Sequence, residues 1–277
     1  LDSSDVWANP KLFQLGSDLL PLLVAGCPAD DFAPLGQLWG NPLYDYKVMK
    51  QDDYSWWVRR VEVAVKLFDT IRIDHFRGFE AYFTIPYGDT DALGGKWKKG
   101  PNVALFNAIR KALGDVDIIA ENLGFLTPGV HKMLNKLGYP GMKILEFGFD
   151  PKGDSEHMPH HLTKSDVVYT GTHDNLPVRA WYDTLNDAEK AFLHEYLYFN
   201  NPYEVGNELI RAALASCCNL AIIPFWDYLQ KGLEARINTP SVLGGNWTFR
   251  IEKGDMNKDL CDYIAKLMIT YRRYIEE

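Results

Sequence analysis

Five short, mainly apolar segments constrain the fold of this chain more than any other feature. They lie at residues 71–74, 117–121, 142–147, 167–175 and 220–225. Short apolar runs bounded by turn residues indicate buried strands. Helix-like stretches separate most of them, and such alternation is typical of parallel strands joined by right-handed crossovers. The sequence therefore predicts an α/β fold.

Helical spacing of apolar residues predicts the intervening helices. Two other stretches, residues 24–46 and 79–102, are rich in aromatic residues but broken by Gly and Pro, and we expect long ordered loops there. Trp39, Tyr44 and Tyr46 offer flat faces to a ligand, although a loop that only covers a core explains them as well. The predicted helices lie at residues 51–69, 102–113, 127–137, 186–197, 203–218 and 257–275.

The segment Ile71-Arg72-Ile73-Asp74-His75-Phe76-Arg77-Gly78-Phe79 has the composition of a functional site. A carboxylate between two guanidinium groups, here Arg72 and Arg77, should stay ionised at physiological pH. Asp74 is then suited to act as a nucleophile or to stabilise a cation. The alternative, an ion-pair cluster that fixes the end of a strand, is equally compatible with this segment alone.

Three carboxylates follow predicted strands: Asp74, Glu121 and Asp174. Carboxyl ends of parallel strands meet on one face, which in a β/α barrel is the catalytic face. Five strands do not close an eight-stranded barrel, so three are absent from this chain. An open doubly wound sheet is the alternative, but no Gly-rich phosphate loop follows any of these strands.

Paired carboxylates suit glycoside cleavage with retention, which needs a nucleophile and an acid/base about 5 to 5.5 Å apart. Asp74 suits the nucleophile. Glu121 follows Ile118-Ile119-Ala120 and should be poorly solvated, which raises its pKa and suits the acid/base. Asp174, beside His173, would hold sugar hydroxyls and favour the distorted ring of the transition state.

Charge and composition exclude several classes of partner. The net charge is -8 and the pI is near 5.4, with no basic stripe, so we expect neither nucleic acid nor a membrane surface as a partner. No apolar run reaches the roughly twenty residues of a membrane span. The four Cys, two of them adjacent at Cys217 and Cys218, are interpreted as buried free thiols in a reducing compartment, so the predicted location is cytoplasmic.

Five segments in the same order resemble those of the amylomaltase or disproportionating-enzyme family of 4-α-glucanotransferases. They are VAGCPADDFAPLGQLWGNPLYDY, RIDHFRGF, IIAENLG, YTGTHDN and EARINTP. The resemblance extends from SSDVWANP to GGNWTFR, nearly the whole chain. It implies a (β/α)8 TIM barrel related to the α-amylases, which cleaves α-1,4-glucans and maltooligosaccharides through a covalent glucosyl-enzyme and transfers the glucan to another sugar's 4-hydroxyl.

The resemblance also implies roles for individual residues. It makes Asp74 the nucleophile, Glu121 the acid/base and Asp174 the transition-state stabiliser, in agreement with the reasoning from the residues. It implies no cofactor and no metal, and the His-rich stretch 156–161 is accordingly interpreted as a polar loop. The residues that it implies for sugar binding are Arg72, His173, Trp39, Asn41 and Asn238.

The chain departs from the family pattern at two positions. Asn122 stands where Asp is common, which removes a charge beside Glu121, and Asp31 stands where the covering loop commonly has Tyr. The family's barrel also begins well before Leu1. The five strands therefore map onto barrel strands four to eight, and residues 1–277 are expected to form one partial catalytic domain of a longer protein.

Two alternatives to an active glucanotransferase follow. One is a truncated, inactive half-barrel that binds glucan or self-associates through exposed strand edges. The other is a hydrolase acting on the same bond, although an apolar covering loop around Phe32 and Trp39 favours transfer because it excludes water. The sequence does not define the donor length or the natural acceptor.

Overall fold

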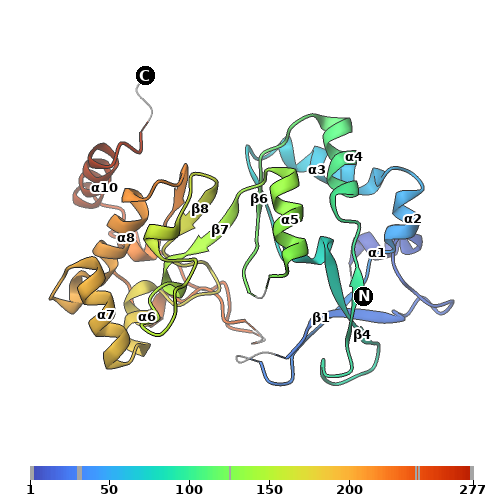
Figure 1. Ribbon diagram of the computed structural model, residues 1–277, viewed down its shortest axis with the longest axis horizontal. Coiled ribbons are helices and arrows are strands. Elements are labelled where there is room, and N and C mark those ends of the chain that lie inside the picture. The colour runs from blue at the N-terminus through green and yellow to red at the C-terminus, as the bar shows by residue number, and fades with distance from the viewer. Residues whose placement is uncertain (1–2, 30–32, 125, 241, 243, 275–277) are drawn as a thin grey trace. The chain divides into compact units, whose positions relative to one another are not determined.

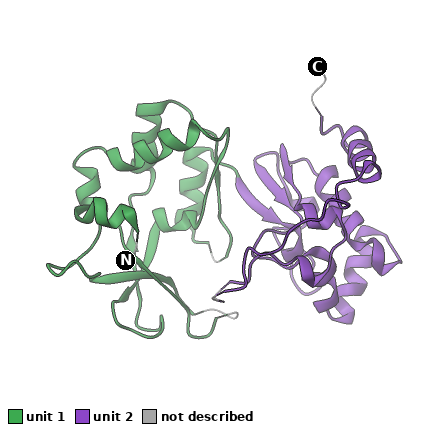
Figure 2. Cartoon of the chain, turned by 180° about the vertical axis from the view of Figure 1, so that it is seen from behind, with its two compact units in different colours: residues 1–140 green, residues 141–277 purple. Residues whose placement is uncertain are grey.

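The computed structural model describes residues 3–29, 33–124, 126–240, 242 and 244–274. The chain forms two compact units, residues 1–140 and 141–277, which Figure 2 colours separately. Both units combine parallel strands with helices, so the α/β prediction is confirmed (Figure 1).

An antiparallel sheet of four strands, in the order β2-β1-β4-β5, lies in the first unit. The two predicted loops were therefore wrong. The sequence conceals these strands because β5 reads Lys-Trp-Lys-Lys and is exposed throughout, while glycine interrupts β1. Gly26 is required there, since a Cβ atom would lie 2.3 Å from the carbonyl oxygen of Gln37 on β2. The bounds are β1 Leu23–Cys27, β2 Gln37–Pro42, β4 Ala81–Pro86 and β5 Lys96–Lys99.

Strands β3 (Ile71–Ile73) and β6 (Ile118–Ala120) form a parallel pair in the same unit. Ile71 pairs with Ile118 and Ile73 with Ala120, so both strands end at the same level. The predicted strands and helices around them are confirmed, although α3 is shorter than expected. The helices of this unit are α1 Ser4–Ala8, α2 Tyr46–Lys50, α3 Ser55–Val65, α4 Val103–Leu113 and α5 Pro128–Leu137, with the 3-10 turns η1 Pro10–Leu12 and η2 Phe76–Phe79.

Capping residues define the ends of the helices that follow β5 and β6. The Asn102 side chain accepts a hydrogen bond from Val103 N at the start of α4. Helix α5 has Pro128 in its first turn, where a missing N–H costs nothing, and ends at Gly138 with φ of 72°. Both helices are therefore bounded by local sequence.

The aromatic core of the first unit supports the segment that follows β3. Phe76 is fully buried, and its ring centroid lies 5.0 Å from that of Phe106 and 5.6 Å from that of Phe79. Tyr44 and Tyr46, which the sequence offered as ligand-binding faces, instead pack against this core, where Tyr44 contacts the rings of Trp56 and Trp57. This packing fixes the backbone that directly follows His75.

Three parallel strands, in the order β7-β8-β9, form the sheet of the second unit. They are β7 Gly141–Ile144, β8 Asp166–Tyr169 and β9 Leu220–Ile222. Three predicted strands were too long, because residues 145–147 form a 3-10 turn, β8 ends at Tyr169, and Pro224 precedes a short helix. The helical elements are α6 Val178–Thr184, α7 Asp187–Leu197, α8 Val205–Ala215, α9 Phe225–Tyr228, α10 Lys258–Thr270, η3 Leu145–Phe147, η4 Pro159–His161, η5 Pro202–Glu204 and η6 Leu233–Ala235.

A second core lies between this sheet and its helices. Val168 of β8 and Leu209 and Ala213 of α8 are fully buried in one cluster. Helix α7 begins with a reciprocal capping box: the Asn186 side chain accepts a hydrogen bond from Glu189 N, and the Glu189 side chain accepts one from Asn186 N. The loops at the carboxyl ends of β7 and β8 are thus attached to a well-packed unit.

All four cysteines carry free thiols, as expected. Their predicted burial was wrong for most of them: Cys218 is buried, Cys27 is half-buried, and Cys217 and Cys261 are exposed. None of the helices in the described part of the chain is long and apolar enough to cross a membrane.

Candidate active site

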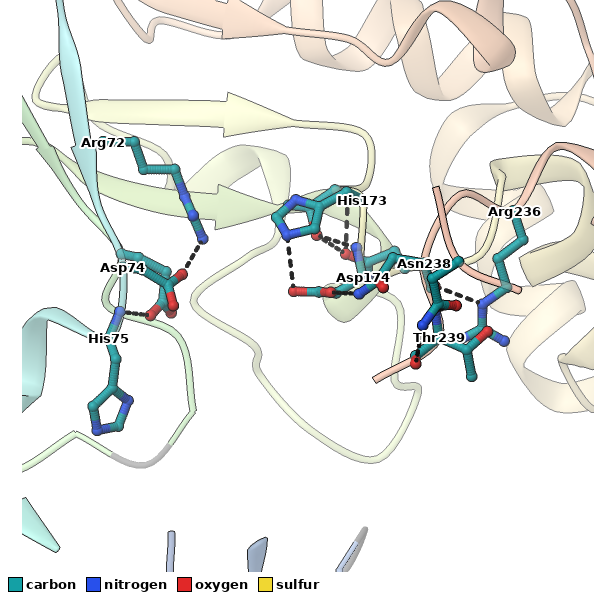
Figure 3. A network of polar contacts seen from close by, with 12 residues as sticks. Arg72, Asp74, His75, His173, Asp174, Arg236, Asn238 and Thr239 are labelled. Carbon is teal, nitrogen blue, oxygen red and sulfur yellow. Dashed lines mark hydrogen bonds and ion pairs between the residues drawn. The ribbon is translucent and has the colours of Figure 1, made fainter. Parts of the chain in front are cut away.

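The parallel register of β3 and β6 positions two of the predicted carboxylates. Asp74 follows Ile73 and Glu121 follows Ala120, and Ile73 and Ala120 are paired residues. The Asp74 side chain is 77 % exposed, and its Oδ1 lies 3.0 Å from Nη2 of Arg72 (Figure 3). An accessible carboxylate beside one guanidinium group is suited to nucleophilic attack or cation stabilisation.

Arg77 does not share this role. The sequence suggested that it flanks Asp74, but its guanidinium carbon lies 3.9 Å from the ring centroid of Trp97, and its side chain is buried. The reason is the 3-10 turn η2, which begins directly after His75 and redirects the chain. The ion pair that holds Asp74 therefore comes from Arg72.

Glu121 is held by backbone N–H groups at both oxygens. His75 N donates to its Oε2 at 2.7 Å, and Leu123 N donates to its Oε1 at 2.8 Å. Burial raises the pKa of Glu121, the nearby Asp74 raises it further, and the two N–H donors and Arg72 lower it, with a net rise. A fixed, poorly solvated carboxyl group whose proton persists to higher pH is suited to acid/base chemistry.

His75 connects Glu121 with the aromatic side chain of β2. Its backbone is left-handed, with φ of 45°, and this conformation directs its N–H towards Glu121. The ring of Trp39 meets the His75 ring edge to face at a centroid distance of 4.9 Å, and burial lowers the pKa of His75. Asn41 lies two residues beyond Trp39 on the same strand and is exposed. Trp39 thus contacts the residue that lies between Asp74 and the buried Phe76 in the sequence.

The third carboxylate, Asp174, lies in the second unit on the turn after β8. His173 Nε2 lies 3.3 Å from its Oδ2, and Asn238 Nδ2 donates to its Oδ1 at 2.6 Å (Figure 3). Asn238 belongs to the segment after η6, 64 residues away, which Arg236 stiffens by donating from Nε to the Asn238 carbonyl oxygen at 3.1 Å. Two predicted sugar-binding residues therefore contact Asp174 directly.

Sequence reasoning missed several residues around Asp174. The ring of Trp247 lies 5.4 Å from that of His173, and the only signal for it was an aromatic residue in a Gly-rich segment. Two buried carboxyl groups, Glu146 and Asp227, also follow strands of this unit. Glu146 could have been found as another acidic residue after an apolar run, whereas Asp227 has no such signal because it lies inside a helix.

The remaining predictions concern the two departures from the family pattern, the apolar covering loop and the His-rich stretch. Asn122 is buried and neutral, so no charge beside Glu121 comes from this position. Asp31 and Phe32 lie outside the described residues. In the His-rich stretch, His157 is a structural acceptor for Ile144 N at 3.0 Å, and burial lowers its pKa to about 4. His160 and His161 instead group with Asp154 at the surface, with their ligand atoms within 4.8 Å of one another.

Several known proteins are similar to this chain in sequence. A family model described as 4-alpha-glucanotransferase matches residues 1–256. The 4-alpha-glucanotransferase of Clostridium butyricum is 44 % identical over 274 residues, which are 98 % of this chain and 56 % of the relative. The chloroplastic/amyloplastic 4-alpha-glucanotransferase of Solanum tuberosum is 46 % identical over 274 residues, 98 % of this chain and 48 % of that protein.

A solved structure is also similar. The amylomaltase from Streptococcus agalactiae in complex with acarbose superposes with a TM-score of 0.95 at 39 % identity, covering 98 % of this chain and 55 % of that one. The chain thus spans about half the length of the curated relatives that it matches.

Proposed function

Since the chain belongs to the 4-alpha-glucanotransferase family, we propose that the protein containing it transfers α-1,4-linked glucan from one maltooligosaccharide to another with retention. The single observation that carries the proposal is the register of β3 and β6. It brings an exposed Asp74 and a half-buried Glu121 to the same end of two neighbouring strands. The whole protein, not this half alone, is the proposed enzyme.

In the first proposed step, Asp74 attacks the anomeric carbon of the donor. A bond forms between its carboxylate oxygen and C1, the bond from C1 to the glycosidic oxygen breaks, and Glu121 gives its proton to that oxygen. Arg72 orients the attacking carboxylate at 3.0 Å. The raised pKa of Glu121 favours this step because it retains the proton that the leaving oxygen needs.

In the second step, the acceptor's 4-hydroxyl attacks C1 and its proton passes to the Glu121 carboxylate, which releases Asp74. Asp174, with His173 and Asn238, is proposed to hold ring hydroxyls and stabilise the oxocarbenium-like transition state. Trp39 and Asn41 on β2 are proposed to contact glucan. We propose that β2 also favours transfer over hydrolysis, because it limits the access of water to the donor.

We further propose that β3, β6, β7, β8 and β9 are strands four to eight of a (β/α)8 barrel, and that residues 1–277 are part of one catalytic domain. Leu220 and Ile222 of β9 are 42 % and 38 % exposed, as expected for strand residues that further barrel elements would cover. Self-association through such edges is the alternative. We also propose a cytoplasmic location, because the four cysteines carry free thiols.

The proposal is tested with the natural full-length protein and with this chain, each incubated with maltotriose and followed by chromatography. Transfer yields longer maltodextrins together with glucose, whereas hydrolysis yields maltose and glucose without longer products. Activity confined to the full-length protein indicates that this chain is an incomplete half. Absence of both product patterns from the full-length protein overturns the proposal.

Variants then test the roles of the carboxylates. Asp74→Asn should abolish transfer and prevent labelling by a fluorinated maltosyl fluoride, as read by intact mass. The matched control is Asp117→Asn, because Asp117 is an exposed carboxylate at the opposite end of β6. Labelling of Asp74→Asn, or equal loss of activity in both variants, would contradict the assignment of the nucleophile.

A further inference from the structure

Two carboxyl groups are buried together beneath the turn that carries Asp174. Glu146 lies in η3 after β7 and is 6 % exposed, and Asp227 lies in α9 after β9 and is 2 % exposed. Burial of an ionised carboxyl group without compensating partners is costly. The proposed catalytic steps do not explain why these two carboxyl groups are buried.

Asp227 has partners for a negative charge. Its Oδ2 accepts a hydrogen bond from Thr170 Oγ1 at 2.6 Å, and its Oδ1 accepts one from Val178 N at 3.0 Å. Thr170 is itself fully buried at the end of β8, and Val178 begins α6. Asp227 thus joins three elements of the second unit and can carry the charge of the pair.

Glu146 is placed differently. Asn175 donates a hydrogen bond to one of its oxygens, but among the described residues its Oε1 has no hydrogen-bond partner. That oxygen lies against Gly171, where an added Cβ atom would be 2.7 Å away. A closely packed oxygen without a donor, next to the carboxylate of Asp227, disfavours a second negative charge.

The turn above Glu146 is built on Asn175. Its Oδ1 accepts hydrogen bonds from Thr172 N at 2.9 Å and from Thr172 Oγ1 at 2.7 Å. Thr172 Oγ1 in turn accepts one from Asp174 N at 3.3 Å. Because both hydrogens on Oδ1 come from Thr172, the amide nitrogen of Asn175 is the end that reaches Glu146. A continuous set of contacts therefore links Glu146 to Asp174.

We propose that Glu146 is a positioning residue: its neutral carboxyl group holds Asn175 and thereby fixes the turn at residues 172–175 that presents His173 and Asp174. The inference rests on the proposed function for the role of Asp174. Glu146 does not touch substrate in this proposal. It acts through Asn175, and a carboxamide of the same shape can replace it.

The electrostatics agree with a neutral group. Burial raises the pKa of Glu146 well above its ordinary value, the Asp227 carboxylate raises it further, and the Asn175 hydrogen bond lowers it. Asp227, facing Glu146 from α9, has a pKa raised by burial to about 6. The cation nearest to Glu146 in sequence, Lys143 on β7, is paired with Glu156.

The kinetic test uses the full-length protein with Glu146→Leu and Glu146→Gln, and with Glu195→Gln as a control from the exposed face of α7. Glu146→Leu should lower kcat by at least about tenfold, with a smaller change in KM, because Asp174 is misplaced while donor binding is largely retained. Glu146→Gln should recover most of that loss. Full kcat in Glu146→Leu, or a Gln variant as impaired as Leu, overturns the inference.

Two measurements do not depend on catalysis. Near neutral pH, the infrared spectrum should contain the C=O stretch of a protonated carboxyl group, which Glu146→Gln removes and Glu195→Gln retains. Its absence from the unsubstituted protein overturns the inference. If the protein proves not to be a transferase, these spectra are unaffected, so the two failures are distinguishable.

Stability against pH gives the second measurement. A raised pKa in the folded state means that the contribution of Glu146 is complete below its unfolded pKa, about 4.3, and is lost as pH rises towards the folded value. The unfolding equilibrium constant of wild type relative to Glu146→Gln should therefore increase by up to tenfold per pH unit over this range and then level off. A ratio independent of pH overturns the neutral state.

Discussion

Replacing Arg72 by Ala should remove much activity but little stability, and the reason is the exposure of its ion pair with Asp74. The two side chains are 31 % and 77 % exposed, and Nη2 lies 3.0 Å from Oδ1. Solvent-accessible ion pairs contribute about 0.2–1 kcal/mol to stability, because water screens the attraction and two long side chains lose freedom. In a chain of this size, such a loss lowers Tm by about 2–4 °C at most.

The expected effect on catalysis is larger. Arg72 fixes the direction of the Asp74 carboxylate, and a nucleophile misplaced by about 1 Å loses roughly 10²-fold in rate, which is about 2.7 kcal/mol of transition-state stabilisation. Arg72→Lys retains the charge but not the planar fork of donors, so we expect it to fall between wild type and Arg72→Ala. The order of the three proteins in kcat should therefore be Arg, Lys, Ala.

The assay measures kcat/KM with maltotriose and Tm by calorimetry on the same full-length preparations. Arg60→Ala is the matched control, because Arg60 Nη1 forms a similarly exposed pair with Asp5 Oδ2 at 3.1 Å, away from the strand ends. It should lose a comparable amount of stability and retain its activity. The reasoning is refuted if Arg72→Ala stays within about threefold of wild-type kcat/KM, or if it loses more than about 2 kcal/mol of stability.

Three further predictions concern Glu121, Asn238 and Gly138. Glu121→Gln should lower transfer from maltotriose by about 10²–10⁴-fold but should still release fluoride from maltosyl fluoride, whose leaving group needs no proton. Because the pKa of Glu121 is raised and its proton is required, wild-type kcat/KM should fall at alkaline pH. A Glu121→Gln variant whose kcat/KM falls at alkaline pH in the same way would contradict the acid/base role. Asn238→Ala, which removes a 2.6 Å hydrogen bond to Asp174, should reduce kcat/KM by about tenfold or more at unchanged Tm. Gly138→Ala should destabilise the protein by about 1–2 kcal/mol in denaturant titrations because its φ is 72°, whereas Gly254→Ala, with no atom within 4 Å and no positive φ, should be nearly neutral.

The sequence predicted the parallel strands and the residues at their ends because both signals are local. Ile71-Arg72-Ile73, with an isoleucine on each side of Arg72, and the apolar Ile118-Ile119-Ala120 are short enough to be strands. Each leads directly into a carboxylate. In a parallel pair this local order determines the shared edge. The antiparallel sheet could not be found in this way, because β5 is charged along its length and β1 depends on Gly26, whose role appears only where β2 approaches it.

Contacts between residues that are distant in sequence were harder to predict. The resemblance identified Asn238, but its hydrogen bond to Asp174 spans 64 residues and follows from the path of the chain after η6. Arg77 shows the converse, because its spacing from Asp74 suggested an ion pair, yet the 3-10 turn at Phe76 turns it onto Trp97. Spacing along a chain predicts proximity only while the backbone continues in a regular conformation.

Glu121, which is half-buried, and Glu146, which is buried, show that the role of a poorly solvated carboxyl group depends on the donors around it. Both follow short apolar strands, and burial raises the pKa of both. At Glu121 each oxygen accepts a backbone N–H, so the anion formed after proton transfer is stabilised and the proton can be returned. At Glu146 one oxygen lies against Gly171 and has no hydrogen-bond donor within the described part of the chain, so ionisation lacks the compensation that Glu121 has. The first carboxyl group can therefore cycle between two protonation states, as an acid/base must, whereas the second is stable in one and is suited to hold a turn in place.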